Sequence, residues 1–310
     1  MDFHHVSVLL DESIEALNIR PDGIYLDGTL GGAGHSSEIA KRLTSGILIG
    51  VDRDPKALAA AEERLAPWRD RVKLVHSNFR ELDAILDGLG IPAVDGILLD
   101  LGVSSPQLDE AIRGFSYMAD APLDMRMDPS DPLTAWEVVN RWPQEELRRI
   151  LFSYGEERYA PLIAAAIVRQ REQAPIDTTL ALVDVIRSAM PQKALREKQH
   201  PAKRSFQAIR IAVNDELGAV DGVMSRAIAR LNPGGRLAVI TFHSLEDRIV
   251  KNAMTEAAKG CTCPPEFPVC VCGKKPTLKL IARKPITAGE TELEQNPRAR
   301  SAKLRVGERI

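Results

Sequence analysis

Residues 26–35 read Leu-Asp-Gly-Thr-Leu-Gly-Gly-Ala-Gly-His, an apolar run that passes directly into a glycine-rich turn. A helical pattern follows from Ser36. Glycines at a strand-to-helix junction let the backbone approach a bound nucleotide closely, at the edge where open α/β sheets hold their ligands. The G-x-G-x-x-G dinucleotide fingerprint is met only loosely. The stretch therefore predicts a ligand-binding turn in an α/β sheet without naming the ligand.

The first hundred residues alternate apolar runs with helical patterns, which is typical of a parallel sheet covered by crossover helices. One helix is predicted over 55–68, with Asp54 as its N-cap and Pro55 in its first position. The four predicted strands are Ile24–Asp27, Ile47–Asp52, Val72–His76 and 96–101.

The alternation stops at about residue 107, and helical patterns without a convincing strand continue to about residue 200. Thr134 and Glu137 have the spacing of a capping box. Asp177 is predicted to cap a helix over 180–190. These residues indicate an all-helical insert.

The alternating pattern resumes after the insert, so the insert interrupts one sheet domain. The pattern predicts a long helix over 205–231, a turn over 232–235, a strand over 236–242, and an antiparallel edge hairpin formed by 278–284 and 301–307. We therefore predict a Rossmann-like α/β fold, a mostly parallel twisted sheet with an inserted helical domain. The predicted domain boundaries are 1–106, 107–200 and 201–310.

The composition is that of an ordinary globular protein. The chain has 310 residues, of which 44% are hydrophobic and 27% charged, and this excludes collagen-like, coiled-coil and disordered classes. No apolar stretch approaches the roughly 20 residues of a membrane span, and the first residues lack the apolar core of a secretory signal. We expect a cytoplasmic protein that does not enter a membrane, while the oligomeric state stays open.

Positive charge is concentrated in two segments although the formal net charge is only -2. Residues 273–310 carry ten Lys or Arg against four Glu, and residues 193–210 carry six against one. Clustered positive charge on an otherwise acidic protein suits a ligand with a phosphate backbone. Solvated basic faces without a ligand are the alternative.

Polar or aromatic residues follow the other predicted strands at the same edge. Asp52 ends the second strand, where an acid can accept hydrogen bonds from both ribose hydroxyls of a nucleoside. Phe79 follows the third strand and Asp100 ends the fourth. An adenosine-type cofactor accounts for all of these positions. Asp27 and Asp100 would repel a pyrophosphate, which favours cationic S-adenosylmethionine over NAD.

The loop after Asp100 contains Ser104, Ser105 and Pro106, and it resembles the loop that amino-methyltransferases place beside the reacting nitrogen. The exocyclic amine of cytosine is a poor nucleophile because its lone pair is delocalised into the ring. Acceptors that hold both N–H groups would favour the tetrahedral nitrogen of the transition state. A tight strand-to-helix turn is the alternative for this loop.

Four motifs occur in order: DGTLGGAGH from Asp27, DLGVSSPQLD from Asp100, ITFHSLED from Ile240 and NPRARS from Asn296. Together they resemble the bacterial RsmH (MraW) family over essentially the whole chain, including residues 5–12. The resemblance implies a class I methyltransferase that modifies N4 of a cytosine in the decoding centre of 16S ribosomal RNA. It also implies that the helical insert recognises the substrate.

The resemblance further implies a set of contacts to S-adenosylmethionine. Phe79 would lie against the adenine. The cofactor-binding residues expected from the resemblance and the glycine-rich turn are Gly31, Gly32, Ala33, Gly34, His35, Asp52, Phe79, Asp100 and Gln107.

His243 is a candidate catalytic or substrate-positioning residue, although a base is not required before methyl transfer from a sulfonium; a structural histidine is the competing interpretation. The candidates for phosphate contact in the RNA of the small ribosomal subunit are Lys203, Arg204, Arg298 and Arg300, together with Lys303 and Arg305. The target cytosine would have to leave its stack. Trp136, Trp142 and Tyr154 are expected to be core aromatics rather than stacking platforms.

All four cysteines, Cys261, Cys263, Cys270 and Cys272, fall within twelve residues. In a reducing compartment such a cluster is more often a metal site than a disulfide framework. The one-residue spacers are shorter than those of the usual zinc knuckle. A zinc site and a reduced structural turn both remain open, no metal ligand is assigned, and the family resemblance implies no role for the cluster.

Two other functions remain open at this point. A non-catalytic RNA-binding assembly factor would keep the basic segments but tolerate loss of Asp52 and Asp100. An NAD-dependent oxidoreductase would need a pyrophosphate beside Asp27 and Asp100.

Overall fold

The computed structural model describes residues 7–264, 267–269 and 271–310, with the Ser105 side chain also left out. Within these residues the chain forms two compact units. A sheet unit contains Met1–Gly102 and Leu217–Ile310, and a helical unit contains Val103–Glu216. No helix among the described residues combines the length and apolar character needed to cross a bilayer.

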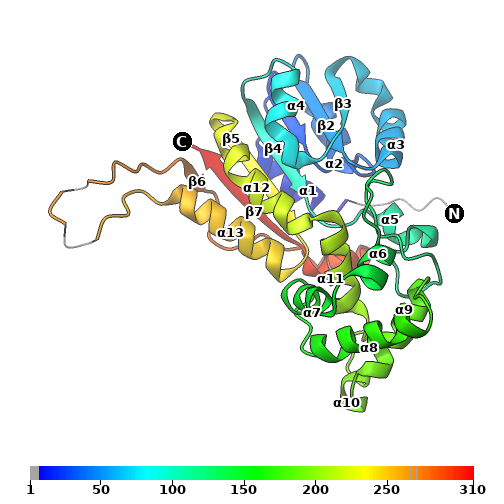
Figure 1. The fold of residues 1–310 in the computed structure, drawn as a ribbon. Helices are drawn as coiled ribbons and strands as arrows, with labels where there is room; N and C mark the ends of the chain where they lie inside the picture. Colours follow the sequence, from blue (N-terminus) through cyan, green and yellow to red (C-terminus); the bar gives the residue numbers. More distant parts are fainter. Residues whose placement is uncertain (1–6, 265–266, 270) are drawn as a thin grey trace. The chain divides into compact units, whose positions relative to one another are not determined.

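The sheet unit contains seven strands in the order β3-β2-β1-β4-β5-β7-β6 (Figure 1). The first five strands in the chain run parallel, while β7 is antiparallel to both β5 and β6. The strand order reverses between β1 and β4, which is where open α/β sheets hold their ligands. The strands are β1 Ile24–Asp27, β2 Ile47–Asp52, β3 Val72–His76, β4 Val94–Asp100, β5 Leu231–Thr241, β6 Leu278–Leu280 and β7 Lys303–Arg309. The mostly parallel sheet with an antiparallel edge is confirmed.

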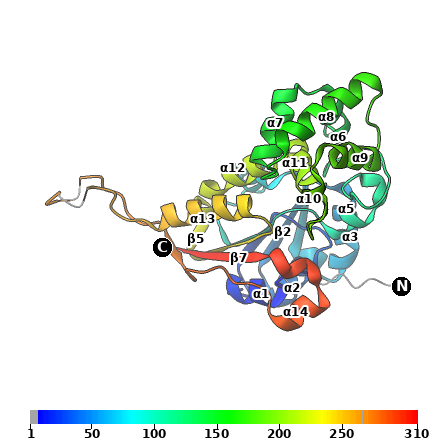
Figure 2. The same cartoon turned by 90° about the horizontal axis from the view of Figure 1, so that it is seen from below.

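Helices cover both faces of this sheet. Leu26 and Leu237 belong to a core with α4, α12 and α13, whereas Tyr25 and Leu98 belong to a core with α1, α2 and α3. Successive strand residues point to opposite faces, so neighbours in sequence enter different cores. Figure 2 shows α12 and α13 on one side of β7 and α1 and α14 on the other. The helices are α1 Leu10–Leu17, α2 Gly34–Arg42, α3 Pro55–Leu65, α4 Leu82–Gly88, α12 Glu216–Ala229, α13 Ser244–Ala258 and α14 Glu290–Gln295.

The helical unit has its own core, formed mainly by α6, α7, α8, α9 and α11. The expected capping box of Thr134 and Glu137 is present at the start of α6. Trp136, Trp142 and Tyr154 pack partly buried against this core, as expected. The helices are α5 Ser105–Asp109, α6 Ala135–Arg141, α7 Gln144–Ser153, α8 Ala160–Gln173, α9 Thr179–Ala189, α10 Gln192–Leu195 and α11 Lys203–Asn214.

The single helix predicted over 205–231 is wrong, because α11 ends at Asn214 and α12 begins at Glu216. Asp215 between them has a left-handed φ of 47°. Asn214 is buried and holds this break: its Oδ1 accepts from Met127 N (2.8 Å) and its Nδ2 donates to Met125 O (2.7 Å). The helical unit thus reaches Glu216, whereas the sequence placed the end of the insert at residue 200.

Three local expectations also differ from the structure. Thr178, not Asp177, caps α9 by accepting from Ala181 N, while Asp177 accepts from Trp136 Nε1 (2.8 Å). Residues 232–235 lie inside β5 at a register shift against β4 rather than in a separate turn. The helix predicted over 55–68 changes after Leu65 into a 3-10 helix, Ala66–Arg71.

We expect Gly96→Ala to lower the free energy of unfolding by about 1–3 kcal/mol, the usual cost of overpacking. A Cβ on Gly96 would lie 2.6 Å from Cδ1 of Tyr25, which is only 1% exposed. Gly88→Ala is the matched control, since its Cβ would meet nothing within 4 Å. Urea unfolding followed by circular dichroism measures both variants, and equal stabilities would contradict this packing.

Candidate cofactor and substrate site

The turn between β1 and α2 is tied to the end of β2. Gly31 has a left-handed φ of 48°, and its N–H donates to Asp52 Oδ2 (2.8 Å). Leu30 N donates to Val51 O (3.1 Å). Ala33 precedes α2 with φ 56°, a region that residues other than glycine rarely occupy. Contacts between the two strand ends therefore hold the turn in an unusual backbone conformation.

At two glycines near this turn, neighbouring side chains lie too close for a Cβ atom or in tight contact with its position. At a third glycine the space is open. A Cβ on Gly34 would lie 1.9 Å from Ser7 Oγ, so only glycine fits there. A Cβ on Gly28 would lie 3.0 Å from Phe79 Cβ, which places Phe79 against the start of the turn. A Cβ on Gly32 would meet nothing within 4 Å. The turn is thus packed on the protein side and open beside Gly32.

Buried carboxylates lie beside the turn. Asp27 is 1% exposed and accepts from Ser36 Oγ (2.7 Å) and Thr29 N (3.1 Å). Burial raises the pKa of Asp27 to about 6. Burial and the charges of Asp27 and Glu246 raise the pKa of Asp100 well above its usual range. These three carboxylates, Asp27, Asp100 and Glu246, form an acid cluster that a cation would stabilise.

Asp100 is the member of the acid cluster with unused hydrogen-bonding capacity. Its Oδ1 is buried and has no hydrogen-bond partner among the residues that the structure describes. Its Oδ2 lies 3.8 Å from His35 Nδ1, beyond hydrogen-bond distance. Asp100 N donates to Thr29 Oγ1 (2.6 Å), which joins the end of β4 to the turn. A buried polar atom without a partner is a signal for a ligand.

His35 and Asp52 are held in defined orientations. His35 is buried, and its Nε2 lies 3.1 Å from Val8 O, which can only accept, so Nε2 carries a proton. Asp52 accepts from Gly31 N through Oδ2 and from Asp54 N (2.9 Å) through Oδ1. Burial raises the pKa of Asp52. Its oxygens keep lone pairs that could accept further hydrogen bonds.

The structure places His243 at the start of α13 as a capping residue. Its Nδ1 accepts from Glu246 N (3.4 Å), and its Nε2 lies 3.1 Å from Glu246 Oε1. Glu246 in turn accepts from Phe242 N (2.9 Å). Because Nδ1 accepts, the proton of a neutral ring sits on Nε2, which is buried and has no hydrogen-bond partner among the described residues. This geometry favours the structural interpretation of His243.

Glu246 was not predicted as a site residue. The signal was present in the sequence, because Glu246 stands three residues after His243 directly beyond an apolar run, the spacing of a capping box. Its burial, with 1% exposure, and its charge on Asp100 were visible only in the folded chain.

The candidate residues of the loop after Asp100, from Ser104 to Gln107, belong to the helical unit. Ser104 caps the short helix α5, and its N–H donates to Gln107 Oε1 (3.0 Å). Gln107 is 5% exposed. Ser105 and Pro106 are the first two residues of α5. Gln107, which is expected to contact the cofactor, thus also stabilises the start of α5 by accepting from Ser104 N.

The basic candidates differ in their contacts. Arg298 and Arg300 are exposed on the 3-10 helix Pro297–Ser301. Lys203 is exposed at the start of α11, and Arg204 Nη1 donates to Glu156 O (3.1 Å). Lys303 and Arg305 instead form ion pairs with Asp247 at 3.2 Å and 2.6 Å, and they hold the pKa of that carboxyl below its usual range. We therefore keep the first four as candidates for phosphate contact and omit Lys303 and Arg305.

Comparisons with known proteins match the chain over its full length. The model of the MraW methylase family matches residues 2–310. Ribosomal RNA small subunit methyltransferase H of Brevibacillus brevis is 59% identical over 311 residues, 100% of this chain and 99% of the relative. The protein of the same name from Clostridioides difficile is 56% identical and is covered completely. A solved structure of an rRNA methylase from Streptococcus thermophilus aligns over 97% of this chain and 93% of its own, with 11% identity and a TM-score of 0.40.

We expect Asp27→Asn to remove a pH-dependent loss of stability. The pKa of Asp27 is about 3.8 in the unfolded chain and about 6 in the folded one. Its favourable contribution to the free energy of unfolding is therefore complete below pH 4 and is lost as the pH rises through 6. The free energy of unfolding of the variant should exceed that of the parent by up to about 3 kcal/mol at pH 7 and should equal it at pH 3.5. Urea unfolding at several pH values measures this gain. A difference that stays constant with pH would contradict the buried charge.

Proposed function

Since the chain belongs to the MraW methylase family, we propose that it transfers a methyl group from S-adenosylmethionine to N4 of a cytosine in the decoding centre of 16S ribosomal RNA. The observation that carries the proposal is the buried acid cluster beside the glycine-rich turn, with Asp100 Oδ1 lacking a partner among the described residues. The ribosomal substrate is supported by the names of the full-length relatives.

The residues at the turn fit S-adenosylmethionine. This cofactor carries an ammonium and a sulfonium, and when bound it supplies an electrophilic methyl group. Asp100 would accept from the ammonium, since its Oδ1 needs a donor and a neighbouring cation lowers the cost of its burial. Asp52 would accept from the ribose hydroxyls, and Phe79 would lie against the adenine. The turn residues Gly31, Gly32, Ala33, Gly34 and His35 would line the methionine moiety, with Gln107 as the further contact implied by the family.

The same cluster argues against NAD. A pyrophosphate brought beside Asp27, Asp100 and Glu246 would meet carboxylates rather than the helix N-terminal donors that it prefers. An oxidoreductase is therefore not supported.

The cytosine amine would be activated by acceptors rather than by a base. The Ser104 hydroxyl and the carbonyl of Ser105 before Pro106 would accept its two N–H groups and favour the tetrahedral nitrogen of the transition state. The alkylated amine is acidic and loses its proton to solvent. His243 would act by holding the start of α13 and the Glu246 carboxylate, since its Nδ1 already accepts from Glu246 N.

The RNA would be held through its phosphates. Lys203, Arg204, Arg298 and Arg300 would supply salt-dependent affinity that does not select a base. Selection of the target requires the cytosine to leave its stack, as in other enzymes that act on bases. We place substrate recognition in the helical unit, and action on the small ribosomal subunit in the cytoplasm.

We expect Asp100→Ala to lower kcat/KM for methyl transfer by about 100-fold or more, as loss of a fixed electrostatic partner does. The assay uses labelled cofactor and small ribosomal subunits from cells lacking this gene, and mass spectrometry identifies N4-methylcytidine. Removing a buried acid should leave the fold intact, and the exposed Asp184→Ala is the control. Unchanged turnover would remove Asp100 from the site. Full cellular function of an inactive variant would instead support a non-catalytic assembly factor.

We expect the double change Arg298→Glu and Arg300→Glu to weaken RNA binding at least about tenfold. The slope of log affinity against log salt concentration should also become shallower, by the amount that corresponds to about two lost phosphate contacts. Cofactor affinity should not change. The charge-matched control, Arg69→Glu with Lys73→Glu, lies at the opposite edge of the sheet, on and beside β3. Filter binding at several salt concentrations measures both, and equal effects of the two pairs would contradict a local RNA contact.

A further inference from the structure

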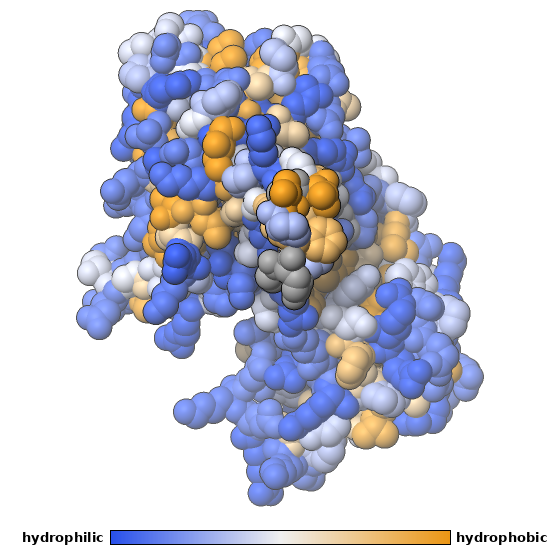
Figure 3. All heavy atoms as spheres, turned by 90° about the vertical axis from the view of Figure 1, so that its left-hand side faces the viewer, coloured by the Kyte–Doolittle hydropathy of each residue, from blue (hydrophilic) through white to orange (hydrophobic). Residues whose placement is uncertain are grey.

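The loop between α13 and β6 carries every cysteine of the chain and has no part in the acid cluster. Its ends are held together: Thr277 N donates to Ala257 O (2.9 Å), and Lys259 and Lys274 both pair with Glu256. Phe267, Val269 and Val271 of this loop are exposed, and Figure 3 shows apolar side chains at the surface of the face that it draws. The described residues of the loop between Gly260 and Pro276 therefore contribute no side chain to the hydrophobic cores.

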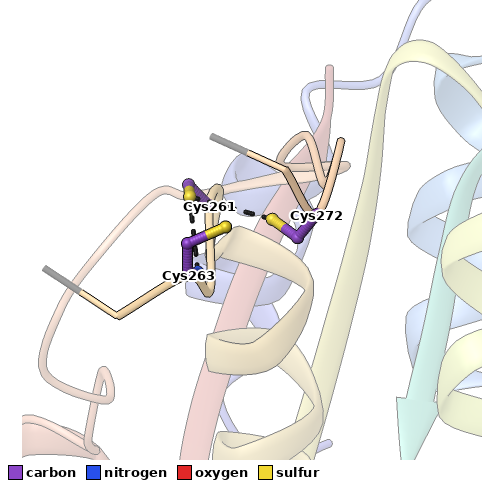
Figure 4. A group of neighbouring side chains, drawn as sticks. All are labelled: Cys261, Cys263 and Cys272. Atoms are coloured by element: carbon purple, nitrogen blue, oxygen red, sulfur yellow. Dashed lines mark hydrogen bonds between the residues drawn. The ribbon is translucent and has the colours of Figure 1, made fainter. Parts of the chain in front are cut away.

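Three thiols converge near the closed base of the loop. The sulfur atoms of Cys261, Cys263 and Cys272 all lie within 4.8 Å of one another. Figure 4 shows the three side chains beside one another at the base of the loop. The Cys261 and Cys272 sulfurs are 3.7 Å apart. A tetrahedral zinc ion with Zn–S bonds of about 2.3 Å places its sulfur ligands about 3.8 Å apart. The observed separation fits two thiolates on one such ion. Cys270 lies outside the described residues.

Each of these sulfurs also accepts a backbone N–H. Cys263 N donates to Cys261 Sγ (3.4 Å), Val271 N to Cys263 Sγ (3.3 Å), and Thr262 N to Cys272 Sγ (3.4 Å). N–H donors stabilise negative charge on the atom that accepts them. The same groups would donate to the sulfurs of a bound metal thiolate. They also orient the sulfurs despite the short C-x-C spacing.

We propose that Cys261, Cys263 and Cys272 form a thiolate site that binds a zinc ion and cross-links the loop. Each thiol releases a proton to solvent on binding, and no electron transfer is involved. Sulfur ligands select zinc and other thiophilic ions over magnesium or calcium. The ion would fasten residues 261–263 to residue 272 in a loop that has few buried apolar contacts.

The test uses the full-length chain, purified under reducing conditions and freed of metal. Zinc affinity is measured by competition with a chromophoric chelator, and cobalt replaces zinc to report sulfur-to-cobalt charge transfer. We expect one ion per chain, the charge-transfer band, and at least about a 100-fold loss of affinity in Cys261→Ser and in Cys272→Ser. Val269→Ser, an exposed change in the same loop, is the matched control and should bind as the parent does.

Three results would overturn the proposal: no zinc binding by the reduced chain, binding that survives the triple change to serine, or a disulfide that forms in place of the metal site under the reducing conditions. Limited proteolysis gives a second readout, because zinc should protect the loop from cleavage in the parent but not in Cys272→Ser. These measurements need neither methyl transfer nor RNA, so the outcome is independent of the proposed function.

Discussion

Burial of carboxylate charge at the reversal point of the sheet is the constraint on which the site depends. Asp27 and Asp100 end the adjacent strands β1 and β4, and burial raises the pKa of both. Ser36 Oγ and Thr29 N compensate Asp27 by donating to it, whereas Asp100 Oδ1 has no such donor among the described residues. Burying these charges costs folding energy, which either protonation or a neighbouring cation would lower.

The glycine-rich turn and the acid cluster depend on each other. Asp52 holds the turn through Gly31 N, and Thr29 Oγ1 joins it to the end of β4. Glycine is needed where the N-terminal segment approaches Gly34, while the space beside Gly32 stays open. The backbone of the glycine-rich turn is thus fixed by the same strand ends that carry the acids.

The helical unit forms around a different constraint, a core that does not require the sheet. Asn214 ends α11 by bonding backbone groups of Met125 and Met127, so the chain turns at Asp215 before α12 begins. The left-handed φ of Asp215 is what separates the two helices, and the hydrophobic pattern on either side of it does not encode that single backbone angle.

Local pattern determined much of the molecule. The period of the apolar residues predicted the strands and most helices, and the glycines predicted the turn at residues 28–34. The positions of Asp52, Phe79 and Asp100 at or after strand ends made them candidate site residues. Each of these signals lies within a few neighbouring residues, so the sequence alone contains it. Only the tertiary structure brought Glu246 to Asp100, assigned Nδ1 of His243 to a helix cap, paired Asp247 with Arg305 and gathered the thiols of the cysteine loop. These features depend on burial and on contacts between distant segments, and no local periodicity encodes them.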